Sequence, residues 1–165
     1  MISLTDGLPD SLIIHGVEHK IKTDYRTWLR LMDTNNYKSL FIGKAPPPSK
    51  ELIHEIQRFL SRGEDSKGEE DSSPIIDFKL DADYIYSSFL QAYGINLLKA
   101  DMHWFEFMAL FKSLPEETIM RKIIEYRQYD GKDEELLRLK RAWALPEKLT
   151  EEEKAAGDYF EEVFG

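Results

Sequence analysis

The polar residues best placed for chemistry lie in the most apolar stretch of the chain, residues 101–114, where His103 and Glu106 stand among aromatic residues. Side chains three positions apart in a helix are neighbours, so these two could pair and exchange a proton. A buried glutamate must find such a partner or stay protonated. A polar seam on the exposed face of the helix accounts for the same pair without catalysis, and we favour it over an active site.

The pair of carboxylates Asp81 and Asp83 is a second candidate for acid–base chemistry. Paired acids serve hydrolases when one of them has a raised pKa. Both residues, however, fall at the start of a predicted helix, where acids stabilise the unpaired N–H groups and the positive end of the helix dipole. We therefore expect Asp81 to cap this helix.

The histidines indicate no metal site. His54 and Glu55 begin like a zinc-protease helix, but Arg58 occupies the position of the second histidine. His15 and His19 could meet across the arms of a hairpin, yet two imidazoles fall short of the four ligands of a structural zinc site. We expect surface histidines and no bound metal.

Catalytic motifs are missing from the sequence. It contains no Gly-rich phosphate loop, no Gly-x-Ser-x-Gly elbow and no dinucleotide-binding fingerprint. The absence of cysteine excludes disulfides, thiolate metal sites and a cysteine nucleophile. We therefore expect no catalytic residue and no cofactor, and a protein that is not an enzyme.

The net charge of -9 is concentrated in two segments. Residues 63–74 carry five acids and one base, residues 147–165 carry seven acids and two bases, and the rest of the chain is neutral. A surface for duplex nucleic acid needs a basic face, so no nucleic-acid partner is expected. No stretch approaches the roughly 20 apolar residues that span a bilayer, so we expect no membrane contact and a cytoplasmic protein.

Length and composition predict one globular domain, residues 1–165, because 42% hydrophobic residues in a chain of this size can enclose a single core. Residues 63–74 have no apolar side chain and are predicted to form an acidic flexible loop. Thr150 and Glu153 form a capping box that opens a predicted acidic C-terminal helix within residues 147–165.

A helix over residues 101–114 is the element that must position His103 and Glu106, and it is hydrophobic around nearly its whole circumference. Trp104, Phe107 and Phe111 fill most of the circumference that its apolar stripe leaves free. Such a helix must be covered by other helices or present one face to a partner. We therefore expect the rest of the chain to be organised around it.

The elements around this helix are predicted from turns, caps and apolar stripes. A hairpin over residues 11–22 turns at Gly16, which supplies the positive φ of a tight turn. Five further helices are predicted, and they run over about 24–32, 50–60, 81–93, 115–128 and 133–144.

Local sequence signals mark the ends of these helices. Thr23 or Asp24 and Ser49 cap the first two helices, Gly94 ends the third, and a capping box over residues 113–116 starts the fourth. The helix over about residues 133–144 is expected to bury Leu136, Leu137 and Trp143. Residues 33–48 are not assigned. The predicted fold is mainly α, a single domain of about six helices with a small N-terminal β-hairpin.

Several sequence blocks resemble the bacteriophage gene-product-fifteen family, a tail-module family of tailed phages and prophages of Gram-positive bacteria. The blocks are ISLTDGLPDS at 2–11, TDYRTW at 23–28, DADYIY at 81–86, YGI at 93–95, ALFK at 109–112, LPE at 114–116 and ALPE at 144–147, with Phe78, Phe89, His103-Trp104 and Tyr126-Arg127. Residues 33–74 depart from the family pattern.

The resemblance implies a small tail-assembly protein in the cytoplasm of the bacterial host, acting as a non-enzymatic chaperone or adaptor that binds the tape-measure protein. A helical domain with aromatic walls suits that role, because it can cover the apolar face of a partner helix. Tyr84, Trp104, Phe107 and Trp143 are the expected partner contacts, and a homo-oligomer is also allowed. Two alternatives stay open: a structural tail or connector subunit of the virion, and an unrecognised enzyme that uses Glu106 and His103.

Overall fold

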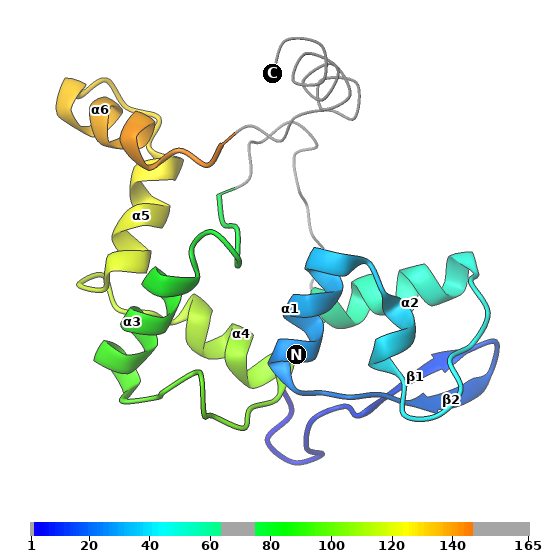
Figure 1. Ribbon diagram of the computed structural model, residues 1–165. Helices are drawn as coiled ribbons and strands as arrows, with labels where there is room; N and C mark the ends of the chain where they lie inside the picture. Colours follow the sequence, from blue (N-terminus) through cyan, green and yellow to red (C-terminus); the bar gives the residue numbers. More distant parts are fainter. Residues whose placement is uncertain (1, 64–74, 147–165) are drawn as a thin grey trace, which may run out of the picture.

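The computed structural model describes residues 2–63 and 75–146, and this part of the chain is mainly α-helical with a two-stranded sheet. Six α-helices and one short 3-10 helix follow the N-terminal hairpin, which confirms the predicted fold class (Figure 1). The predicted acidic loop, apart from Gly63, and the predicted acidic C-terminal helix lie outside the described residues.

The hairpin consists of β1 (Ser11–Ile14) and β2 (Val17–Lys20), paired antiparallel with Ile14 opposite Val17. His15 and Gly16 form the turn with φ values of 50° and 74°, as a two-residue type I′ turn requires. The predicted turn is therefore confirmed. The hairpin packs on α2 (Lys50–Leu60) and so does not stand alone.

The predicted caps of the first two helices are confirmed. The Asp24 carboxylate accepts from the backbone N–H of Arg26 at the start of α1 (Tyr25–Thr34). Ser49 Oγ accepts from the N–H of Leu52 in α2 at 3.1 Å. Each cap gives a partner to an N–H group that the first helical turn cannot satisfy.

Between these helices the chain forms η1 (Tyr37–Leu40) and then returns to the hairpin. The N–H of Lys22 donates to Leu40 O at 2.7 Å, and Ile21 forms an antiparallel bridge with Phe41. Leu40 and Phe41 are buried as a result. This segment, which the sequence left unassigned, therefore closes one end of the core.

Two helices from the second half of the chain follow. The helix α3 (Ala82–Tyr93) ends at Gly94, whose φ of 66° is the left-handed conformation predicted there. The helix α4 (Trp104–Lys112) is shorter than the predicted 101–114. Its N-cap residue His103 has an extended backbone, with ψ at 147°, and so the helix cannot continue back through it to residues 101 and 102.

The helix α5 (Ile119–Gln128) begins later than predicted, and the capping box over residues 113–116 is wrong. Residues 115–118 instead form a turn in which the N–H of Thr118 donates to Pro115 O at 3.0 Å. The N–H of Met120 in the first turn of α5 donates to Ser88 Oγ of α3 at 3.1 Å. A side chain from another helix thus supplies the partner that the local sequence was expected to provide.

The helix α6 (Glu134–Trp143) lies where a helix was predicted and is capped by Asp133, but the expected burial of its apolar residues is wrong. Leu136, Leu137 and Trp143 are all partly exposed. Figure 1 shows α6 at the outer end of the molecule, beyond α5. The helix packs mainly on α5, with a further contact from Tyr84 of α3 to Trp143, so its apolar residues are only partly covered.

The core surrounds α4, which lies between the hairpin, α1 and α2 on one side and α3 and α5 on the other (Figure 1). Four aromatic residues of α4 are buried, and they are Trp104, Phe105, Phe107 and Phe111. The predicted covering of this helix is therefore confirmed. Within residues 2–63 and 75–146, none of the helices combines the length and the apolar composition needed to cross a membrane.

Candidate functional site

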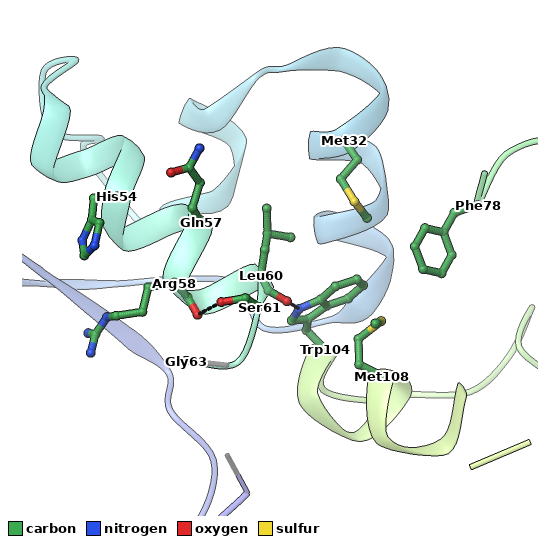
Figure 2. Close-up of a pocket in the computed structure, with 10 residues that line it drawn as sticks. All are labelled: Met32, His54, Gln57, Arg58, Leu60, Ser61, Gly63, Phe78, Trp104 and Met108. Atoms are coloured by element: carbon green, nitrogen blue, oxygen red, sulfur yellow. Dashed lines mark hydrogen bonds between the residues drawn. The ribbon is translucent and has the colours of Figure 1, made fainter. Parts of the chain in front are cut away.

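A groove of about 900 Å³ lies between α1, α2, α4 and the connection that precedes α3. Figure 2 shows Met32 of α1, Trp104 and Met108 of α4, and Phe78 of the connection around it. The other lining residues belong to α2 and the turn after it, and they are His54, Gln57, Arg58, Leu60, Ser61 and Gly63. Helices from both halves of the sequence therefore build the groove.

Trp104 joins two sides of the groove. Its indole Nε1 donates to the carbonyl oxygen of Leu60, the last residue of α2, at 3.2 Å. Carbonyls in the last turn of a helix lack partners within that helix, so this bond satisfies one of them. Because Trp104 is only 2% exposed, its ring is fixed in place. It therefore holds the end of α2 against α4 and sets the shape of the groove.

Flexible apolar side chains line the groove. Met32 is 41% exposed, and Met108, Leu60 and Phe78 are half-buried. Methionine is unbranched and polarizable, so it can adapt to partner side chains of different shapes. This lining suits the apolar face of a helix better than a rigid small molecule.

Among the described lining residues of the groove, the charged side chain is that of Arg58, and it is basic. Arg58 is 60% exposed at its side chain and donates to Glu55 of the same helix at 2.6 Å, while the His54 side chain is 73% exposed. Among the described lining residues there is no carboxylate. An occupant that carries acids beside apolar side chains would therefore match the groove in both respects.

The four predicted partner contacts lie in two places. Trp104 and Phe107 are 2% and 1% exposed, so both belong to the core, although Trp104 also lines the groove. Tyr84 and Trp143 are half-buried and pack edge to face with 5.3 Å between ring centroids, where α3 meets α6. The structure thus places the four residues as two pairs at different sites. Binding of a partner by any of them stays a prediction.

His103 and Glu106 both cap α4. His103 Nδ1 accepts from the N–H of Phe105, and Glu106 Oε2 accepts from the N–H of His103, each at 2.9 Å. Because Nδ1 is an acceptor, the ring proton lies on Nε2, which donates to Pro9 O at 2.8 Å. The expected side-chain pair is therefore wrong in its detail, and the two residues form a capping box that starts the central helix.

We expect His103→Ala to lower the free energy of unfolding by about 1–2 kcal/mol, because it removes both the cap and the bond to Pro9. Urea denaturation followed by circular dichroism measures this. His103→Asn keeps an acceptor for the cap and is expected to lose less. Equal losses in the two variants would show that the cap contributes little.

A buried ion pair, which the sequence analysis missed, connects α3 to α5. Asp81 is 1% exposed, and its carboxylate oxygens lie 2.7 and 2.8 Å from Arg127 Nη1 and Nη2. The same guanidinium donates to the carbonyls of Ile75 and Trp143. Asp81 is the residue before α3, but its side chain binds Arg127 and the N–H of Asp77 rather than capping the helix as predicted.

A signal for this pair was present in the sequence. Arg127 follows Met120, Ile123 and Ile124 at helical spacing, so it falls on the buried stripe of α5. A charged residue at such a position needs a partner of opposite charge. The identity of that partner, however, depends on how α3 and α5 pack.

Several other titratable side chains have partners within the fold. The hydroxyls of the buried Tyr25 and the half-buried Tyr93 donate to the carbonyls of Leu97 and Leu110, and removal from water raises the pKa of both tyrosines. His15 contacts Glu51 at 2.7 Å. In residues 2–63 and 75–146, no group of three or more His, Asp or Glu side chains is placed to hold a metal ion.

Comparison with known proteins adds a family to this geometry. A family model described as "Bacteriophage Gp15 protein" matches residues 49–147, which is more than half of the chain. The matched region includes α2, Phe78, α4 and the Asp81–Arg127 pair, and so most of the groove. The expectation that residues 33–74 depart from the family pattern is therefore wrong for residues 49–74, which the family model matches. Curated proteins and solved structures gave no match.

Proposed function

Because this chain belongs to the Bacteriophage Gp15 protein family, we propose that it is a non-enzymatic chaperone or adaptor of phage tail assembly that binds the tape-measure protein. The observation that carries this proposal is the groove between α1, α2 and α4, with its two methionines and exposed apolar lining. The groove takes one amphipathic helix of the partner, with the apolar face of that helix against Met32, Phe78 and Met108.

The physical need for such a protein lies in the partner. A tape-measure protein is a long helical chain with apolar faces, and such faces aggregate when nothing covers them. A groove lined by methionines can accept successive segments that differ in sequence, because its side chains rearrange at low cost. Binding would end when tail-tube subunits cover the same faces.

Co-expression with a tape-measure fragment tests the proposal. We expect the full chain to increase the soluble fraction of the fragment and to elute with it in size-exclusion chromatography. Met32→Glu should weaken the complex at least about tenfold, because a carboxylate would face apolar partner side chains without a counter-ion. Isothermal titration calorimetry with a purified fragment measures the change.

The matched control is Ile13→Glu, which places the same charge at a 59% exposed position of β1, outside the groove. It should leave the affinity unchanged. If the fragment stays insoluble and no complex elutes, the chaperone proposal is wrong. Detection of the chain in purified phage particles by mass spectrometry would instead indicate a structural tail or connector subunit.

A further inference from the structure

The end of α6 lies near the segment that leads into one wall of the groove. Arg127 donates from Nε to Trp143 O at 2.7 Å and from Nη1 to Ile75 O at 2.9 Å. Two carbonyls bound by one guanidinium are close neighbours, because its donors form a compact fork. Ile75 lies three positions before Phe78 of the groove lining, so α6 ends near the segment that leads into that wall.

The segment that follows, residues 147–165, is long enough to reach the groove. A fully extended chain spans up to about 3.3 Å per residue, so this segment could extend to about 60 Å. Even in a helical conformation it would span about 28 Å, which is comparable to the diameter of a small domain. Its length therefore places no limit on contact with any part of the groove.

The sequence of this segment also complements the groove. It contains seven acids and two bases, whereas the described lining residues include the basic side chain of Arg58 and no carboxylate. Apart from Leu149, the large apolar residues of the segment are Tyr159, Phe160, Val163 and Phe164. Their spacing is the one that places side chains on the same face of a helix. Acids beside an apolar face are the features that the groove's lining favours in an occupant.

From this position and complementarity, we propose that residues 147–165 occupy the groove of their own chain in the free protein and compete there with the partner. The competing partner is the tape-measure protein, so the competition rests on the proposed function. Occupancy of the groove by the segment can be measured on the protein alone.

Such a segment would regulate binding through its tether. A segment joined by a short linker acts at an effective concentration of about millimolar, so even a weak contact keeps the groove largely filled. The apparent affinity for a partner falls by the fraction of molecules in which the groove is free. The segment would also cover Met32 and Phe78, which would otherwise favour self-association.

Paramagnetic relaxation in the full chain tests this proposal. The native sequence has no cysteine, so Gly157→Cys gives a single attachment site for a nitroxide. Met32 and Met108 line the groove, whereas Met120 is 0% exposed in the core. We expect the methyl signals of Met32 and Met108 to lose several-fold more intensity than that of Met120, and equally at all protein concentrations.

A matched pair of variants checks that the apolar residues of the segment are responsible. Phe160→Ser with Phe164→Ser in the labelled chain should restore the Met32 and Met108 signals, and Ala155→Ser with Ala156→Ser should not. If the proposed function is also correct, the Phe160 and Phe164 variant should bind the tape-measure fragment several-fold more tightly than the wild-type chain.

Two results would overturn the inference. One is equal broadening of all three methionine signals or none at all, which would place the segment elsewhere. The other is broadening that increases with protein concentration, which would mean that the segment comes from a second copy. Neither result bears on the co-expression experiment, so failure of the regulatory proposal and failure of the proposed function are distinguishable.

Discussion

Arg127→Met is expected to lower the free energy of unfolding by about 3–5 kcal/mol. The substitution leaves the Asp81 carboxylate, which is 1% exposed, without its counter-ion. It also removes the donors that bind the carbonyls of Ile75 and Trp143, so α6 should lose its attachment first. Urea denaturation measures the global loss, and hydrogen exchange in α6 measures the local one.

The control for this prediction is Arg121→Met in the same helix. Arg121 lies 3.5 Å from Glu125 with both side chains largely exposed, so its loss should cost no more than about 0.5 kcal/mol. Adding Asp81→Asn to Arg127→Met should cost less than the sum of the two single changes, because the stranded charge is then removed. Equal effects of Arg127→Met and Arg121→Met would contradict the assigned role of the ion pair.

Phe107→Ala should also cost about 3–5 kcal/mol, because it opens a cavity at the centre of the core. The Phe107 ring is 1% exposed and stacks on Tyr25 and Phe89 with centroid distances of 4.7 and 5.3 Å. It also stacks on Trp104, which holds the end of α2. Thermal and urea denaturation should both show the loss.

Two other variants separate this effect from a general sensitivity to mutation. Phe107→Leu retains most of the buried volume and should lose clearly less than the alanine variant. Leu90→Ala removes a residue of α3 that is 46% exposed, and it should change the stability by no more than about 0.5 kcal/mol. A loss from Phe107→Ala that matches Leu90→Ala would show that Phe107 is not central to the core.

The groove itself was only partly predictable. The sequence identified Trp104 as a special residue because it lies in the most apolar helix, and the structure does place it in the groove lining. Met32, Phe78 and Met108 carried no comparable signal, since half-exposed apolar residues at helical spacing resemble ordinary core residues. Their shared surface exists only because α1, α2 and α4 meet at Trp104.

Charged residues were harder to assign than apolar ones. Asp81 has the residue type and position of an N-cap, and nothing within four residues of it indicates another role. Its partner Arg127 is 46 positions away in the chain. The competition between capping and ion pairing was therefore decided by packing, since a buried carboxylate is more stable beside a guanidinium than against helix N–H groups alone.

The start of α5 also could not be predicted from local sequence. A plausible capping box was present over residues 113–116, yet the helix starts at Ile119, where Ser88 of α3 accepts from the N–H of Met120. Both arrangements satisfy an unpaired N–H group. The second depends on the position of α3, which places Ser88 beside the start of α5.

By itself, the sequence determined the elements of this protein: the hairpin turn at Gly16, the caps at Asp24 and Ser49, the end at Gly94, and the apolar helix at the centre. These features depend on atoms within about four residues of each other, so local chemistry specifies them. Tertiary structure alone decided the partner of Asp81, the start of α5, the exposure of α6 and the groove. Each of those depends on residues far apart in the chain, and their burial and hydrogen bonding are set only when the helices pack.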